Sequence, residues 1–329
     1  MNLVREVALR VLVAGGAGFI GSHLCARLLR EEHTVVCVDN LLTGVERNIT
    51  ELLAAERFSF VRHDITEPFD IEADAIFQLA SPASPVGYWT YPFETIRVNT
   101  IGTTNLLDIA CRHGALLLTA STSEVYGDPL EHPQSETYFG NVNPVGTRAC
   151  YDESKRLGET ITMEYVRRMG VDARIVRIFN TYGPKSQLDD GRMIPNFITQ
   201  AITGKPLSIH GDGSQTRSIC YVDDLVDGLM RALFTPGTTG EVYNLGNPEE
   251  HSVLEWAKLI IHLCDSASEI VFEPKREDDP ERRRPNIEKA RAALGWEPSV
   301  SPEDGLRRTI AWFRIEMERE GLCQPARAG

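Results

Sequence analysis

Several features that define other classes of protein are missing from this sequence. No run of apolar residues approaches the length of a membrane span, and residues 1–10 lack the apolar core of a signal peptide. The seven cysteines are scattered and odd in number, and the eight histidines show no HExxH or similar pairing. The net charge of −13 argues against a nucleic-acid partner, because binding duplex needs a basic face. We therefore expect a cytoplasmic protein with no membrane contact, no metal and no nucleic-acid partner.

The composition of the 329 residues is that of an ordinary globular protein, with 42% hydrophobic and 25% charged residues. Apolar segments of strand length alternate with helical patterns as far as Pro184, which predicts a Rossmann-type α/β fold with a doubly wound parallel sheet. We expect an NAD-binding domain over 1–184 and a smaller, mostly helical substrate domain over 185–329. The chain is expected to return to the first domain at about 218–246. Strands are predicted at 11–14, 35–38, 58–65, 75–80, 115–120, 171–179, 207–210 and 241–246, and helices at 45–55, 92–113, 191–204 and 221–234.

The segment 11–21 has the order that a dinucleotide-binding motif requires, with a strand, a glycine turn and a helix. Gly15 allows a tight turn, Gly18 lets the backbone approach a pyrophosphate, and Gly21 lets helix and strand pack closely. The free N–H groups and the positive dipole end of the helix then face the phosphates. Because an ordinary strand-to-helix turn could carry the same glycines, the interpretation needs support from the residues downstream.

A carboxylate at the end of the next strand gives that support. Asp39 follows the glycines by roughly 20 residues, where it can accept hydrogen bonds from both ribose hydroxyls of adenosine. It would repel a 2′-phosphate, so the sequence favours NAD over NADP. Asp64, at the end of the strand after that, is a candidate for the adenine amine. For both aspartates the alternative is a turn residue that caps a loop.

Tyr151 and Lys155 form the one Tyr-x-x-x-Lys pair in the chain, and the spacing places them on one face of a helix. An ammonium one turn away, together with the positive charge of a nicotinamide, would lower the pKa of the tyrosine. The resulting phenolate could accept a hydroxyl proton while hydride leaves the same carbon. Thr122, in the hydroxyl-rich segment that ends a strand, could add a second hydrogen bond. The alternative is a surface contact between an aromatic ring and a lysine.

Arginines in the second half are candidates for phosphate binding, because the guanidinium fork matches phosphate geometry. Arg192, Arg217 and the run 282–284 are the candidates. Acidic residues flank the run, so a solvated charged surface is the alternative for it.

Several motifs together resemble the extended short-chain dehydrogenase/reductases that act on nucleotide sugars, and within them the UDP-glucuronate decarboxylase (UDP-xylose synthase) family. The similarity extends from about Val11 to Phe313. The matching segments are 15–21, 79–85, 121–129, 140–144, 148–153, 177–181, 215–217 and 244–251.

The resemblance implies that bound NAD oxidises C4 of UDP-glucuronate, with Tyr151 as the base, Lys155 tuning it and Thr122 assisting. The C5 carboxylate then leaves as carbon dioxide and C5 is reprotonated, with Glu124 positioning the sugar or a water for both steps, and C4 is reduced again to give UDP-xylose. The resemblance also implies a homodimer formed by helices near 92–113 and 149–169. Thr147, Ser154 and Lys185 depart from the usual family pattern, so the sugar pocket is expected to differ in detail.

Two sets of binding residues follow from the motifs and the resemblance. For the substrate we expect contacts from Ser84, Ser123, Asn180, Arg192, Gln215, Arg217 and Arg283. For NAD we expect contacts from Gly15, Gly18, Phe19, Ile20, Gly21, Asp39, Asn40, Asp64, Ile65, Leu79, Ala80, Ser81, Asn99, Tyr151 and Lys155.

Three other activities fit the same scaffold. A nucleotide-sugar 4,6-dehydratase usually has an aspartate where Ser123 stands, and serine is a poor acid at neutral pH. A UDP-glucuronate 4-epimerase shares the oxidation step and the substrate, but usually has a small or hydroxyl residue in place of Glu124. A catalytically silent NAD-binding regulator is the third alternative, which the intact Thr122, Tyr151 and Lys155 oppose.

Overall fold

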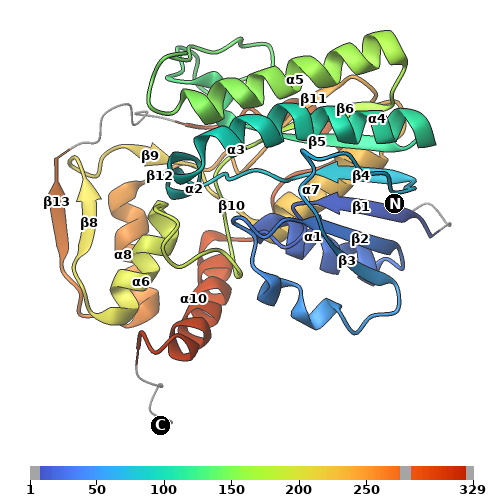
Figure 1. Cartoon of the computed structure of the whole chain (residues 1–329). Helices are drawn as coiled ribbons and strands as arrows, with labels where there is room; N and C mark the ends of the chain where they lie inside the picture. Colours follow the sequence, from blue (N-terminus) through green and yellow to red (C-terminus); the bar gives the residue numbers. More distant parts are fainter. Residues whose placement is uncertain (1–7, 275–282, 324–329) are drawn as a thin grey trace.

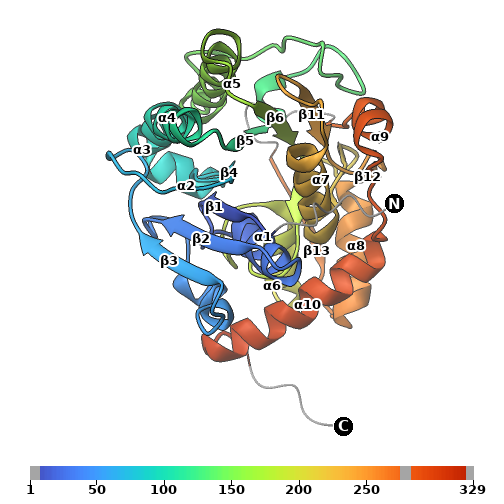
Figure 2. The same ribbon diagram turned by 90° about the vertical axis from the view of Figure 1, so that its right-hand side faces the viewer.

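The structure is a computed structural model, and it describes residues 8–274 and 283–323. Its centre is a seven-stranded sheet in the order β11-β6-β5-β4-β1-β2-β3 (Figures 1 and 2). Every neighbouring pair in this sheet is parallel, so the predicted Rossmann-type architecture is confirmed. The strands are β1 (Arg10–Ala14), β2 (Thr34–Asp39), β3 (Phe58–Arg62), β4 (Ala75–Gln78), β5 (Leu116–Thr122), β6 (Ala173–Ile178) and β11 (Val242–Leu245).

Helices cover both faces of the sheet, and the alternation of side chains along β1 shows how. Val11 and Val13 pack in a core cluster with α1 and α7, whereas Leu12 and Ala14 pack with α4 on the opposite face. Figure 1 shows α3, α4 and α5 lying together along one side of the sheet. The helices concerned are α1 (Phe19–Arg30), α3 (Pro92–Arg97), α4 (Thr103–His113), α5 (Ala149–Met169) and α7 (Val222–Phe234).

The second half forms a smaller layer beside the carboxyl ends of the strands, while α7 and β11 return to the sheet. Three small sheets join segments of this half: β8 pairs with β13, β9 with β12, and β7 with β10. Strands β12 and β13 fall where the sequence predicted no strand. The elements are β7 (Thr181–Tyr182), α6 (Met193–Thr203), β8 (Leu207–His210), β9 (Thr216–Arg217), β10 (Cys220–Tyr221), β12 (His251–Ser252), α8 (Val253–Cys264), β13 (Ile270–Glu273), α9 (Glu288–Leu294) and α10 (Pro302–Arg319).

Two predicted helices differ in detail. The helix expected at 45–55 is two short 3₁₀ turns, η1 (Glu46–Asn48) and η2 (Thr50–Leu52). The helix expected at 92–113 contains a π-helical turn, η3 (Val98–Gly102), between α3 and α4. At this turn the carbonyl of Asn99 lies so close to α5 that a Cβ on Gly158 would be 2.8 Å from it. In residues 8–274 and 283–323, no helix is long and apolar enough to cross a membrane.

Candidate active site

The glycine turn between β1 and α1 has the geometry of a phosphate cradle. Gly15 has φ +79°, and a Cβ there would lie 2.7 Å from Cα of Ala80. A Cβ on Gly21 would collide with the carbonyl oxygen of Gly15. Gly18 is the N-cap of α1, has no side chain to occupy the helix end and lines the main cavity. The backbone N–H groups of the first helical turn are therefore accessible to an anion, as a pyrophosphate requires.

Asp39 lies at the end of β2 with both carboxylate oxygens engaged by backbone. Oδ2 accepts from the N–H of Ala17 at 3.0 Å and Oδ1 from that of Leu41 at 2.8 Å. Burial raises the pKa of Asp39, and the two backbone hydrogen bonds partly oppose this shift. Each oxygen keeps acceptor capacity for a further partner, so ribose binding by Asp39 stays a prediction.

Asp64 caps its own loop, which was the alternative for this residue. Oδ1 accepts from the N–H and the hydroxyl of Thr66 at 2.9 and 2.8 Å, and Oδ2 accepts from Asn40 at 2.9 Å. Burial opposes ionisation of Asp64, but these hydrogen bonds outweigh it and its pKa is lowered. The structure thus joins the predicted residues Asn40 and Asp64, whereas the contact of Asp64 with adenine stays a prediction.

The main cavity has a volume of about 920 Å³ and is lined by residues from both halves of the chain. All seven predicted substrate residues and all four predicted catalytic residues line it. Of the predicted NAD residues, six are not part of its lining: Asp39, Asn40, Asp64, Ile65, Ala80 and Asn99. Ile65 is buried in the core, and Asn99 donates to the hydroxyl of Ser154 at 3.0 Å.

Tyr151 and Lys155 lie on one face of α5 beside Thr122, as predicted. Lys155 Nζ donates to the carbonyl of Ala120 at 2.8 Å and lies 5.9 Å from the centroid of the Tyr151 ring. Burial lowers the pKa of Lys155 to about 7, against the opposing charge of Glu159.

The pKa of Tyr151 was expected to be lowered by Lys155 and a nicotinamide acting together, and the protein alone does not lower it. Burial raises it, and the hydrogen bond from Thr122 offsets only part of that shift. The protein alone therefore keeps Tyr151 protonated, because removing a phenol from water outweighs the effect of the neighbouring residues. An additional positive charge in the cavity is needed to bring this pKa down.

Tyr88 is a residue of the site that the sequence did not reveal. It lies on α2 (Pro85–Thr90), whose first turn is capped by Ser84. Its ring stacks on that of Tyr151, with the centroids 5.2 Å apart and the planes at 15°. No local pattern in the sequence indicated this stacking.

Glu124 is held by two arginines at the end of β5. Arg283 binds both carboxylate oxygens, with Nη2 to Oε2 at 2.9 Å, and Arg148 binds Oε2. Burial opposes ionisation of Glu124, but the charges of Arg283 and Arg148 outweigh it and its pKa is lowered. Glu124 is therefore a carboxylate at neutral pH. Asp152, one turn along α5 from Arg148, has its pKa raised to about 7 by burial and by the charge of Glu124.

Of the two arginines that hold Glu124, the sequence predicted Arg283 as a site residue but not Arg148. Arg283 was expected at the substrate, and its guanidinium lies on Glu124, while its contact with the UDP stays a prediction. Arg148 belongs to a motif that carries the family resemblance, yet it was not predicted as a site residue. Arg282 lies outside the described residues.

The other arginines approach the cavity from the second half. Arg192 Nη2 donates to the carbonyl of Ala83 at 2.6 Å and forms an ion pair with Asp190 at 3.5 Å. Arg217 donates to the carbonyl of Thr216 at 2.8 Å. Both line the cavity together with Asn180, which is compatible with the predicted phosphate contacts.

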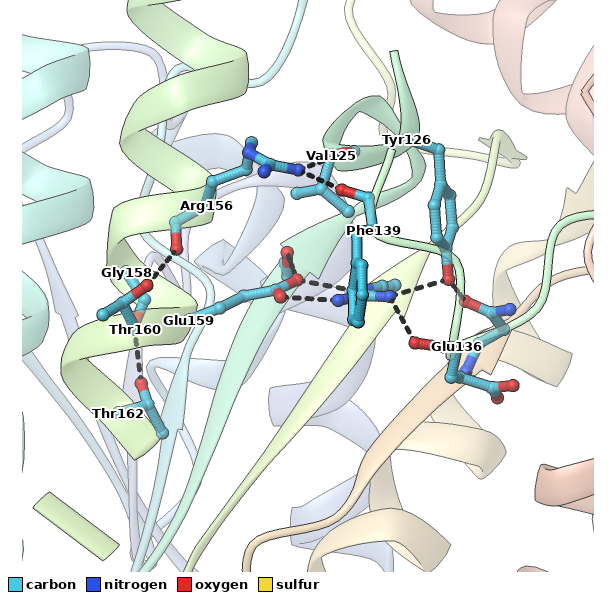
Figure 3. Close-up of polar contacts among 12 residues, drawn as sticks. Val125, Tyr126, Glu136, Phe139, Arg156, Gly158, Glu159, Thr160 and Thr162 are labelled. Atoms are coloured by element: carbon cyan, nitrogen blue, oxygen red, sulfur yellow. Dashed lines mark hydrogen bonds and ion pairs between the residues drawn. The ribbon is translucent and has the colours of Figure 1, made fainter. Parts of the chain in front are cut away.

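A buried polar network lies directly behind the site (Figure 3). Arg177 on β6 donates to both carboxylate oxygens of Glu159 at 2.9 and 2.8 Å, and to the hydroxyl of Tyr126 at 3.0 Å. Ser121, next to Thr122, donates to the same Glu159 at 2.5 Å. The network thus fixes the end of β5 against α5. It was not predicted, because its members are far apart in the sequence.

Comparison with known proteins gives three findings. Residues 11–246 match the NAD dependent epimerase/dehydratase family. The chain is 52% identical over 315 residues to UDP-glucuronic acid decarboxylase 1 of Xenopus tropicalis, covering 96% of this chain and 74% of that protein. It is 51% identical over 326 residues to UDP-glucuronic acid decarboxylase 2 of Arabidopsis thaliana, covering 98% and 73%.

A solved structure is also similar over nearly its whole length. It is that of UDP-glucuronic acid 4-epimerase from Bacillus cereus in complex with UDP-glucuronic acid and NAD, with a TM-score of 0.83 and 29% identity. The similarity covers 93% of this chain and 99% of that chain.

Proposed function

The chain belongs to the NAD dependent epimerase/dehydratase family, and we propose that it is a UDP-glucuronate decarboxylase that forms UDP-xylose. The observation that carries this conclusion is an identity of 52% and 51% to decarboxylases of an animal and a plant, over nearly the whole chain. The carboxylate of Glu124 between two arginines, beside Thr122 and Tyr151, supports the same conclusion.

The cofactor is NAD, and the residues present fit it. The turn from Gly15 to Gly21 would hold the pyrophosphate at the start of α1, and Asp39 would accept from the ribose hydroxyls. When bound, NAD supplies a hydride acceptor for C4 of the sugar and later returns the hydride. Its positive nicotinamide ring is also the charge that Tyr151 needs to ionise.

The first task of the protein is to remove the proton of the C4 hydroxyl. Tyr151 accepts this proton as a phenolate, and Thr122 donates a hydrogen bond to the same oxygen. Lys155, held by the carbonyl of Ala120, stabilises the phenolate in the fraction of molecules in which it is charged. Loss of hydride from C4 then leaves a ketone that is β to the C5 carboxylate.

The second task is to manage the loss of that carboxylate. The bond from C5 to the carboxyl carbon breaks, carbon dioxide leaves, and the electron pair is delocalised into an enolate with the C4 oxygen. A proton must then be added at C5. Glu124, which its arginine partners keep ionised, orients the sugar or a water for both the loss of the carboxyl group and this reprotonation. Return of hydride to C4, with the proton held by Tyr151 going back to the C4 oxygen, completes the formation of UDP-xylose.

One assay tests the function against its alternatives. We expect purified protein incubated with UDP-glucuronate to release one carbon dioxide for each UDP-xylose formed. Formation of UDP-galacturonate without gas would identify the epimerase activity, which the similar solved structure makes the main alternative. A protein that binds NAD and leaves the sugar unchanged would be a silent regulator, and the proposal would be wrong.

The protein also forms a homodimer in this proposal, through the faces of α3 and α5. Phe93 on α3 is 69% exposed and Leu157 on α5 is 49% exposed, and these helices pack side by side (Figure 1). Large apolar side chains exposed on adjacent helices are typical of a surface that a partner covers. A second copy of the chain would form a four-helix interface there.

The double variant Phe93→Asp/Leu157→Asp is therefore expected to be monomeric. Light scattering after gel filtration should give twice 36.7 kDa for the wild type and the single-chain mass for the variant. Ile315→Asp is the matched control, because Ile315 is a 53% exposed residue of α10, away from α3 and α5. A monomeric wild type, or a variant that stays dimeric, would contradict this interface.

A further inference from the structure

Arg283 reaches Glu124 from a segment far along the chain, and the position of that segment depends on Gln134. We propose that Gln134 is a positioning residue for the loss of the carboxylate: it fixes residues 284–286 so that Arg283 keeps both of its contacts with Glu124. This inference rests on the proposed decarboxylase function. Gln134 was not among the predicted site residues, and it does not line the cavity.

Every polar group of Gln134 has a partner. Its side chain is fully buried, with 0% exposure. Oε1 accepts from the N–H of Arg284 at 2.9 Å, and Nε2 donates to the carbonyl of Glu131 at 2.7 Å. The backbone N–H donates to the carbonyl of Arg284 at 2.9 Å, and the backbone carbonyl accepts from the N–H of Asn286 at 2.8 Å. Gln134 thus binds the backbone on both sides of Pro285, immediately after Arg283.

The loop that carries Gln134 is itself attached to the framework behind the site. The carbonyl of Glu136 accepts from Arg177 at 3.1 Å, and its side chain accepts from the N–H of Asn244 at 2.8 Å. Tyr126 donates to Asn244 at 2.7 Å. Figure 3 shows Tyr126 and Glu136 on one side of this network and Glu159, on α5, on the other.

Both ends of the Arg283–Glu124 pair are therefore fixed to one framework. Glu124 is two residues before Tyr126, and Arg283 is one residue before the backbone that Gln134 binds. A bidentate contact between a guanidinium and a carboxylate depends on the relative position of the two groups. Loss of the Gln134 side chain would leave the N–H of Arg284, the residue next to Arg283, without its acceptor, while the two backbone hydrogen bonds to residues 284–286 remain.

Replacement of Gln134 should slow only one chemical step, the loss of the carboxylate. Tyr151 is held by Thr122, Lys155 and Tyr88, none of which contacts Gln134 in the interactions described above. Oxidation of C4 should therefore proceed normally when Gln134 is changed. The steps after oxidation depend on Glu124, so release of carbon dioxide should slow. A residue with a purely structural role would not separate the two steps.

The test compares the two steps in Gln134→Met, which keeps the length of the side chain and removes the amide. In a single turnover with UDP-glucuronate, we expect reduction of the bound nicotinamide within about threefold of the wild type. Release of carbon dioxide should fall by about tenfold to a hundredfold, the effect of a small misplacement in an active site. Equal slowing of both steps, or no change in either, would overturn the proposal.

Thr162→Val is the matched control. It removes another buried side-chain hydrogen bond, that of Thr162 to Thr119 at 2.8 Å, which has no contact with residues 283–286. Both steps should keep their wild-type rates in this variant. If Gln134→Met does not fold, Gln134→Asn takes its place, because its amide is one methylene too short to reach Arg284. The same separation of the two steps is expected.

A double variant tests whether Gln134 acts through Arg283. In the Arg283→Ala background, Gln134→Met should slow carbon dioxide release by less than about threefold further, because the residue that it positions is gone. An undiminished effect in that background would show that Gln134 acts by another route. Measurements on the wild type distinguish failure of this inference from failure of the proposed decarboxylase function. If the wild type releases no carbon dioxide, both the function and the positioning role of Gln134 are refuted. Release from the wild type and equally from Gln134→Met refutes the positioning role alone.

Discussion

The variant Tyr151→Phe is expected to lose C4 oxidation, with a fall in turnover of about a thousandfold or more, within the range for removal of a general base. Phenylalanine keeps the aromatic ring and its stacking on Tyr88, so the cavity keeps its shape. It has no oxygen to accept the proton of the C4 hydroxyl. The measurement is the absorbance of the reduced nicotinamide after mixing with UDP-glucuronate in a single turnover.

Tyr165→Phe is the control for this variant. Tyr165 is also on α5, but its hydroxyl donates to Asp108 at 2.5 Å outside the cavity lining. That variant should reduce the nicotinamide at the wild-type rate. Both variants should retain bound NAD, because the glycine turn is unchanged. Near-normal reduction in Tyr151→Phe would show that another group takes the proton, and the proposed mechanism would be wrong.

The parts of the site that are local in sequence could be predicted. The glycine turn, with its strand before and helix after, is set by residues within one short segment. Tyr151 and Lys155 share a helical face because of their spacing alone. In a parallel sheet the carboxyl ends of the strands meet at one edge, and both the glycine turn and the segment that follows Thr122 line the cavity.

The parts that depend on tertiary packing could not be predicted in the same way. Glu124 and Arg283 are 159 residues apart, and no local pattern pairs them. Lys155 and a nicotinamide together were expected to lower the pKa of Tyr151, and the sequence did not reveal that burial raises this pKa in the protein alone. Burial depends on the assembled cavity, so it cannot be inferred from the spacing of Tyr151 and Lys155.

Tertiary contacts also explain why the fold differs from the sequence prediction at two places. Residues 270–273 form β13 because they pair with β8 across the second half of the chain, and that pairing is not a local property. The segment 45–55 has a helical pattern, but it forms two short turns, and the N–H of Val45 donates to the carbonyl of Ala17 beside the glycine turn. In both places a tertiary contact decides between structures that the local sequence would permit.

The replacement Glu124→Gln should slow loss of the carboxylate far more than oxidation of C4. Glutamine has nearly the same shape, but it removes the negative charge that Arg283 and Arg148 balance. It can neither accept a proton nor orient a water as a carboxylate does. In a single turnover we expect the nicotinamide to be reduced at a rate within about tenfold of the wild type. Carbon dioxide release should fall by about a hundredfold or more, so the reduced form should accumulate.

Stability must be separated from chemistry in that experiment, because breaking a buried ion pair typically costs about 3–5 kcal/mol. Glu316→Gln is a matched control: Glu316 on α10 is buried, forms an ion pair with Arg47 and lies outside the cavity lining. Its melting temperature should fall as that of Glu124→Gln does, while carbon dioxide release at a temperature where both remain folded stays normal. Equal slowing of oxidation and decarboxylation in Glu124→Gln would instead make the residue part of substrate binding. Unchanged carbon dioxide release would remove Glu124 from the mechanism, because its carboxylate, although held between two arginines, would then have no part in the loss of the substrate's carboxyl group.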